Sequence, residues 1–227
     1  MSEKILHISD MTDTASDLKT AILRRIESGA PRGVWTPRDF LDLGGRDAVD
    51  KTLQRLTRAG NLRRVDRGLY DKPSFNTLTQ KSNPPDPRQV IEAIARRDQI
   101  RVLVDGMTAA NDLGLTNAVP AKIVVHADAR LKSVSLGQLG ITFKPTAASK
   151  LYWAGRPAMR IVQALHWLRD TMGQVDDDAV LKRRLNAILQ NPKDGQALRA
   201  DLLAGLSTLP SWMQNLLRPM LKEQAGT

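Results

Sequence analysis

The sequence predicts an α+β fold in two parts, and three observations lead to this prediction. Helical periodicity, followed by two short alternating segments around a glycine, occupies residues 16–75. A stretch rich in proline and small polar residues follows at 76–87 and predicts a linker. Beyond it, short apolar segments alternate with helical ones over 88–227, so we expect a mixed α/β domain with a helical C-terminal part.

Composition and charge bound the function. The 227 residues are 41% hydrophobic and 26% charged, which is typical of a globular protein, and the formal net charge is +10. A basic surface favours polyanions, because Lys and Arg displace the counterions condensed on phosphates. The chain has no cysteine, which excludes disulfides and thiolate metal sites. Residues 1–15 are expected to be a polar tail without a secretion signal, and we expect a cytoplasmic protein.

The first predicted helix begins with Ser16 as its N-cap, because a serine hydroxyl can accept a hydrogen bond from an early backbone N–H. Leu18, Ile22 and Ile26 recur every four residues and form one apolar stripe. Gly29 is expected to end the helix, since glycine tolerates the left-handed conformation that follows many helices.

A second, short helix is predicted to open at Thr36 and Pro37, where threonine caps and proline loses no donor that the helix needs. Its apolar residues are Phe40, Leu41 and Leu43. Two consecutive glycines then predict a sharp turn into the next element.

A third helix is predicted over 46–59, with Val49, Leu53 and Leu56 as its buried stripe. Alternating residues around Gly68 then predict a small β-hairpin. Helix, short capped helix, turn, longer helix and basic hairpin follow one another as in a winged helix-turn-helix. This arrangement suits DNA, because a helix fits the major groove and a hairpin beside it can reach phosphates.

The segment 51–67 carries six basic residues and one acidic residue, and it covers both elements that would touch DNA. Residues early on the third helix, or on its outward face, are candidates for contacts with base edges, whereas the hairpin arginines are better placed for phosphates. The start of the second helix could also meet the DNA backbone. The predicted DNA-binding residues are Thr36, Arg38, Arg46, Asp47, Lys51, Gln54, Arg55, Arg58, Arg63, Arg64 and Arg67.

Other interpretations of these residues remain open. Arg55 and Arg58 could be the solvated face of an amphipathic helix, and Asp47 and Lys51 could pair at i,i+4. Tyr70 is expected to pack in the core or the hairpin. Winged helices also serve as protein-interaction modules, so a domain that meets an acidic partner protein is an alternative to DNA binding.

The second domain is predicted from short apolar segments separated by glycines and prolines, with helical repeats in the last third of the chain. Helices are expected near 90–97 and 108–113, and further helices fill the region after residue 160. The predicted strands lie at 100–104, 122–126, 133–136 and 141–144.

Three segments carry a resemblance to a known family. They read GVWTPRDFLDLGGRDAVDKTLQRLTRAGNLRRVDRGLYDKP at 33–73, DGMTAANDLGLTNAVPAKIVVHAD at 105–128, and AGRPAMRIVQALHWLRD at 154–170. In these segments the chain resembles AbiEi-type antitoxins of type IV toxin–antitoxin systems, which act in abortive infection.

The resemblance implies a repressor that binds inverted repeats in the operator of its own promoter and counters a cognate nucleotidyltransferase toxin. It also implies that the C-terminal domain carries most of the antitoxin activity, with or without direct contact with the toxin. We expect a partner-binding surface in the second domain, although each of its residues could instead be a helix cap, a turn residue or a solvated charge. These residues are Ala109, Asn111, Asp112, Arg156 and Arg160.

Catalytic chemistry has little support. His7, His126 and His166 do not have metal-ligand spacing, so no metal and no cofactor are expected. Asp105 and Lys122 follow or lie in predicted strands, as in a nuclease site, but a second acidic ligand for Mg²⁺ is not evident. We therefore expect a binding protein rather than an enzyme, with a sequence-targeted nuclease as an alternative.

Overall fold

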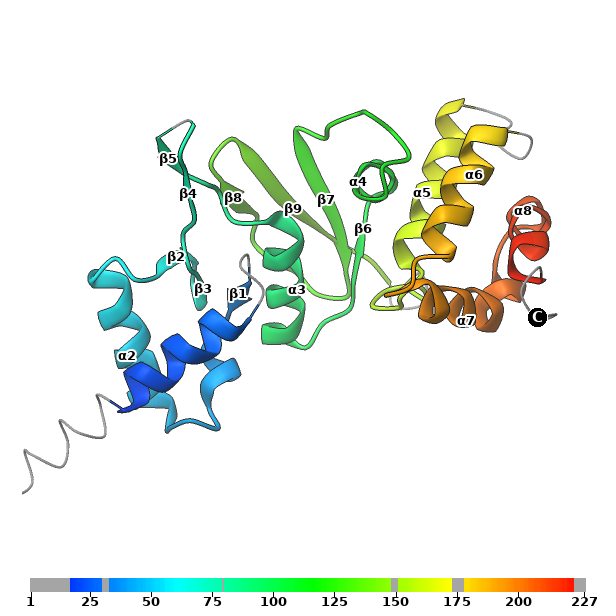
Figure 1. Ribbon diagram of the computed structural model, residues 1–227. Helices are drawn as coiled ribbons and strands as arrows, with labels where there is room; N and C mark the ends of the chain where they lie inside the picture. The colour runs from blue at the N-terminus through cyan, green and yellow to red at the C-terminus, as the bar shows by residue number, and fades with distance from the viewer. Residues whose placement is uncertain (1–16, 30–32, 79, 148–150, 173–177, 223–227) are drawn as a thin grey trace, which may run out of the picture. The chain divides into compact units, whose positions relative to one another are not determined.

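The computed structural model has an α+β fold whose described residues form two compact units (Figure 1). The first unit runs to Ile100 and includes Val134–Gly137, and the second holds Arg101–Ser133 and the residues from Gln138 onwards. The predicted polar tail and the Ser16 cap lie outside the described residues. The structure describes residues 17–29, 33–78, 80–147, 151–172 and 178–222.

The first unit begins with a helix over residues 17–28. A three-stranded antiparallel sheet in the order β1-β3-β2 and a long helix follow it. Gly68, in the turn between β2 and β3, has a φ of 67°, a conformation that favours glycine. The bounds are β1 (Val34–Trp35), η1 (Pro37–Phe40), α2 (Arg46–Arg58), β2 (Arg63–Asp66) and β3 (Leu69–Asp71).

One apolar cluster holds these elements together, and it confirms the predicted stripes. The apolar stripe of helix 17–28 meets the apolar stripe of α2. Both stripes pack on Phe40 of η1 and on Leu62, which follows α2. Trp35 and Tyr70, from β1 and β3, pack against the cluster from the sheet. The buried members are Leu18, Ile22, Ile26, Phe40, Val49, Leu53, Leu56 and Leu62.

The predicted second helix is instead a four-residue 3₁₀ helix, η1. Its start is capped as expected: the Thr36 backbone N–H and hydroxyl both donate to the Asp39 carboxylate, at 2.6 and 3.1 Å. Turns follow at once, and Leu41, which was expected to be an apolar residue of this helix, is 43% exposed. The strand β1 was not predicted, because a two-residue strand leaves no period-2 pattern.

The predicted linker at 76–87 contains structure, and the first unit extends past it. Two short strands, β4 (Phe75–Asn76) and β5 (Lys81–Ser82), pair antiparallel there. The helix α3 (Pro87–Asp98) follows, buries Val90, Ile91 and Ile94, and contacts β1 and β3. The sequence predicts this helix as part of the second domain, but its packing makes it part of the first unit.

The second unit is built on β7 (Lys122–Ala127), which pairs antiparallel with β6 (Val102–Val104) and parallel with β9 (Leu139–Pro145). The predicted strands at 100–104, 122–126 and 141–144 therefore exist, with shifted ends. The helix α4 (Gly106–Asp112) follows β6 and packs on a later helix, α5 (Met159–Met172). The strand β8 (Val134–Leu136) belongs to the first unit.

The end of the second unit is helical, as predicted. Within the described ranges, no helix has both the length and the apolar character that crossing a lipid bilayer requires. The last elements are α5 (Met159–Met172), α6 (Ala179–Leu189), α7 (Gly195–Gly205), η3 (Leu206–Thr208) and α8 (Ser211–Lys222).

Candidate nucleic-acid interface

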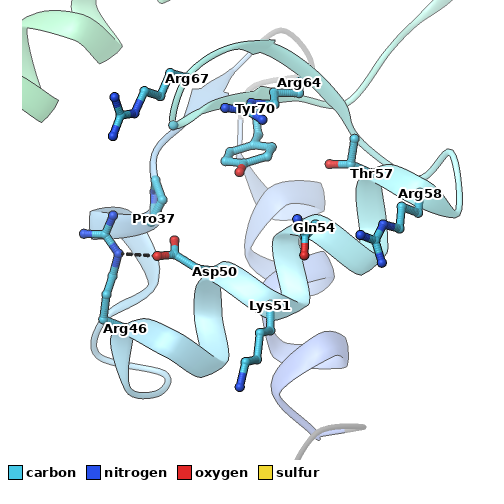
Figure 2. Close-up of a pocket in the computed structure, with 11 residues that line it drawn as sticks. Pro37, Arg46, Asp50, Lys51, Gln54, Thr57, Arg58, Arg64, Arg67 and Tyr70 are labelled. Carbon is cyan, nitrogen blue, oxygen red and sulfur yellow. Dashed lines mark hydrogen bonds and ion pairs between the residues drawn. The ribbon is translucent and has the colours of Figure 1, made fainter.

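A surface groove of about 440 Å³ lies between α2 and the β2–β3 hairpin in the first unit. We call it the α2–hairpin groove, and Figure 2 shows the side chains around it. Eleven residues line it, from η1, α2 and the hairpin: Pro37, Arg46, Asp50, Lys51, Gln54, Thr57, Arg58, Arg64, Arg67, Gly68 and Tyr70.

The groove is strongly cationic. Five of its lining residues are Arg or Lys, and only one is acidic, so the formal excess is four positive charges. The acidic residue, Asp50, forms an i,i+4 ion pair with Arg46 at 2.8 Å, and both side chains are about half exposed. The other four cations, Lys51, Arg58, Arg64 and Arg67, give the groove its net charge, which favours an anionic ligand.

The α2 side of the groove follows from helical periodicity. Leu53 and Leu56 face the core with at most 1% of their surface exposed, so the opposite side of the helix faces solvent. Gln54 lies on that side between Lys51 and Arg58. Figure 2 shows Gln54 towards the hairpin, whereas the Lys51 side chain extends away from it. The groove thus offers an amide and two cations along one helix face.

The hairpin side consists of Arg64, Arg67, Gly68 and Tyr70. Arg64 on β2 lies directly opposite Tyr70 on β3 in the sheet register. Figure 2 shows the Tyr70 ring pointing from the hairpin towards Asp50 and Gln54 on α2. Tyr70 packs on the core, as the sequence predicts, and it also lines the groove. The pairing of Tyr70 with Arg64 in the strand register explains why Tyr70 lies beside the groove, and a local sequence pattern does not show this pairing.

Arg63 has a different environment from its neighbour Arg64. Its guanidinium donates two hydrogen bonds to the Asp71 carboxylate, at 2.9 and 2.5 Å, and a third to the carbonyl oxygen of Asn83, at 2.8 Å. Successive residues of a strand point to opposite faces, so Arg63 cannot share the groove with Arg64. Contrary to the prediction that Arg63 contacts DNA phosphates, it holds β2 to β3 and to the chain before α3.

Thr36, Arg38 and Arg55 also lie outside the groove. The Thr36 side chain is buried against Asp39, so it caps η1 rather than facing a ligand. Arg38 is exposed, and its guanidinium donates to the carbonyl oxygen of Arg97 at 3.2 Å. Arg55 lines a separate small hollow on another side of α2, with Lys19.

Asp47 is exposed near the start of α2 and does not line the groove. An i,i+4 ion pair does form on this helix, but it joins Arg46 and Asp50 rather than the Asp47 and Lys51 that the spacing suggested. Lys51 therefore keeps its place among the groove cations. Of the predicted DNA-binding residues, the groove brings together Arg46, Lys51, Gln54, Arg58, Arg64 and Arg67.

The predicted partner-binding residues of the second unit make contacts within that unit. Ala109 is completely buried in α4, and the Asn111 side chain donates to the carbonyl oxygen of Ala118 at 2.9 Å. Asp112 pairs with Arg160 of α5 at 3.1 Å, and the Asp112 side chain is only 9% exposed. These four residues hold α4 in its place, which is the structural alternative that the sequence analysis left open.

Arg156 is held in the same way. Its guanidinium pairs with the Asp201 carboxylate at 2.7 Å and lies 4.6 and 4.8 Å from the ring centres of Tyr152 and Trp153. The pKa of Arg156 is raised, mainly by its hydrogen bond to Asp201. This guanidinium therefore joins the segment before α5 to α7 by charge and by stacking on aromatic rings.

Asp105 is a helix cap. One carboxylate oxygen accepts from the Thr108 backbone N–H at 3.1 Å, and the other accepts from the Thr108 hydroxyl at 2.7 Å and the Val124 N–H at 3.0 Å. Both oxygens are thus engaged by the chain itself. In the part of the chain that the structure describes, no three His, Asp or Glu side chains are grouped as a metal site would need.

Comparison with known protein families identifies the family of this chain. A family model matches residues 21–197, a span that contains the whole α2–hairpin groove and most of the second unit. It is described as a family of unknown function, DUF6088. The chain belongs to the DUF6088 family. No curated protein matches this DUF6088 chain.

Asp71→Asn should destabilise the first unit, because the Asp71 side chain is 7% exposed and neutralising it leaves Arg63 without its carboxylate. We expect the free energy of unfolding to fall by about 1–3 kcal/mol, measured by urea denaturation. Asp50→Asn is the matched control: it removes a carboxylate from an exposed pair and should cost less than about 1 kcal/mol. Equal losses in the two variants would contradict a structural role for Arg63.

Proposed function

We propose that the first unit of this DUF6088 protein is a winged helix-turn-helix that binds double-stranded operator DNA, and that the protein regulates transcription. The element order supports this proposal: a helix, β1, η1, α2 and a hairpin follow one another, with the sheet order β1-β3-β2. In such a unit α2 would be the recognition helix and the β2–β3 hairpin the wing.

The observation that carries the proposal is the cationic α2–hairpin groove. Its 13-residue helix is about 20 Å long and presents one polar face, dimensions that suit insertion into a major groove about 12 Å wide. Lys51 and Gln54 on that face have the chemistry to read guanine and adenine edges, respectively. Arg64 and Arg67 across the groove would contact phosphates.

The alternatives have less support from the same residues. A metal-dependent nuclease would need a carboxylate available to a cation, and both oxygens of Asp105 accept hydrogen bonds from the chain. An acidic partner protein would also suit a cationic groove, but it would not need an amide such as Gln54 beside the charges. If the affinity depends on the base sequence of the DNA, the groove recognises DNA rather than merely attracting negative charge.

The wider role that we propose is that of an operon autorepressor and antitoxin. It rests on the resemblance of residues 33–73, 105–128 and 154–170 to AbiEi-type antitoxins. On this proposal the first unit represses the protein's own promoter at inverted repeats. The second unit would counter a cognate nucleotidyltransferase toxin, directly or indirectly.

Arg64→Ala should weaken DNA binding and make it less dependent on salt. If Arg64 neutralises one phosphate, the slope of log Kobs against log salt should become less steep by about 0.9. The measurement is a titration of the protein's own promoter DNA at several salt concentrations. Arg55→Ala is the control, since Arg55 has the same charge and belongs to the same unit but lies on α2 outside the groove. An equal change of slope in both variants would speak against the groove as the DNA site.

Gln54→Ala and Lys51→Ala should each change the preference at one position of the operator rather than weaken binding uniformly. Loss of a base contact should reduce discrimination at that position by about 1–3 kcal/mol. Binding to a set of operators with single base-pair substitutions measures this effect. If both variants keep the full preference profile of the wild-type protein, α2 is not the element that reads bases.

The antitoxin role predicts rescue of growth. Co-expression of this protein should relieve the growth defect caused by a nucleotidyltransferase encoded beside its gene. Arg64→Ala should rescue as well as the wild-type protein, because the groove and the antitoxin activity are proposed to lie in different units. Failure of the wild-type protein to rescue would leave a DNA-binding regulator without an antitoxin role.

A further inference from the structure

The turn of the β2–β3 hairpin is held from outside the hairpin. Arg67, in this turn, lines the groove with its side chain, while its carbonyl oxygen accepts a hydrogen bond of 2.7 Å from the guanidinium of Arg97. Arg97 lies in the last turn of α3 and does not line the groove. The turn consists of only two residues, Arg67 and Gly68, and this bond restricts the position of its main chain.

Arg97 is itself held in place. Two of its guanidinium nitrogens donate to the two carboxylate oxygens of Asp98, at 2.8 and 2.7 Å. About three quarters of each side chain is shielded from solvent, which limits screening of the pair. The hydrogen bond from Arg97 is the main cause that lowers the pKa of Asp98. The remaining nitrogen, Nη1, is the one directed to Arg67.

The main chain of Arg97 contacts η1, which also contributes a residue to the groove. Its carbonyl oxygen accepts from the Arg38 guanidinium at 3.2 Å, and Arg38 follows Pro37, the η1 residue that lines the groove. The neighbouring Arg96 donates to the carbonyl oxygen of Val34 in β1 at 3.1 Å and lies 3.7 Å from the Asp39 carboxylate. The end of α3 thus contacts β1, η1 and the hairpin turn.

From these contacts we infer that Arg97 is a positioning residue, which sets the hairpin turn relative to η1 and so the width of the α2–hairpin groove. This inference rests on the proposed DNA binding for its effect on affinity, but the contact itself exists in the protein without DNA. Arg97 acts through the main chain of Arg67, and Asp98 acts by orienting Arg97. Helix α3 therefore helps to position the elements that are proposed to bind DNA.

A direct contact between Arg97 and a phosphate is the competing explanation. The two explanations predict opposite effects of Asp98→Asn on the affinity for DNA. Asp98→Asn makes the protein more positive and releases the guanidinium, so a phosphate-binding Arg97 would then bind DNA more tightly. A positioning Arg97 would instead lose its orientation, and binding would weaken despite the added positive charge. This opposition makes Asp98→Asn the decisive variant.

The experiment compares full-length Arg97→Ala, Arg97→Lys and Asp98→Asn with the charge-matched control Asp17→Asn, an exposed carboxylate on the first helix. We expect Arg97→Ala and Asp98→Asn to lower the affinity for promoter DNA about tenfold, and Arg97→Lys to lie between them and the wild type. The salt slope should stay that of the wild-type protein. Tighter or unchanged binding by Asp98→Asn, or a slope less steep by about 0.9 in Arg97→Ala, overturns the inference.

A second measurement needs no DNA. Trypsin cleaves after arginine, so the rate of cleavage between Arg67 and Gly68 in the free protein reports how firmly the turn is held. Arg97→Ala and Asp98→Asn should be cut faster than Asp17→Asn at this bond, with thermal midpoints close to that of the wild type. Equal cleavage rates overturn the inference. If the wild-type protein does not bind promoter DNA, the proposed function fails, and cleavage alone decides the role of Arg97.

Discussion

The packing of helix 17–28 against α2 is the constraint on which the rest of the first unit depends. Ile22 and Leu53 are fully buried where the two stripes meet, and burying each such side chain contributes about 1.5–3 kcal/mol. A rotation of α2 would expose these side chains, so the helix has one orientation. That orientation directs Lys51, Gln54 and Arg58 to the solvent face, where the hairpin completes the groove.

Arginine has two structural uses in this unit, and they divide the basic residues between them. Arg63 and Arg97 direct their guanidinium groups at carboxylates and carbonyl oxygens, where the planar group can satisfy several acceptors at once. Arg64 and Arg67 line the groove and supply its charge. The total of 34 Lys and Arg residues therefore overstates the number of cations that a polyanion would meet. In this unit, the partners of an arginine decide whether it can face a ligand, and its position in a basic stretch does not.

Periodicity predicted much of the first unit. The apolar stripes of helix 17–28 and α2, the threonine cap and the glycine of the hairpin turn all lie where their local patterns indicated. Elements without a pattern were missed or misjudged, such as the two-residue strand β1 and the 3₁₀ helix η1. The boundary at 76–87 was drawn from composition, but packing of α3 on β1 and β3 carries the first unit past it.

By itself, the sequence determined where the longer helices lie, which of their faces are apolar and where the basic residues gather, because these properties arise between residues a few positions apart. Only the tertiary structure decided which arginines line the groove. Arg63 meets Asp71 across a strand register, and Arg97 meets the carbonyl oxygen of Arg67 thirty residues away in the chain. Such partners are chosen by the folding of the chain in space, and local patterns carry no record of them.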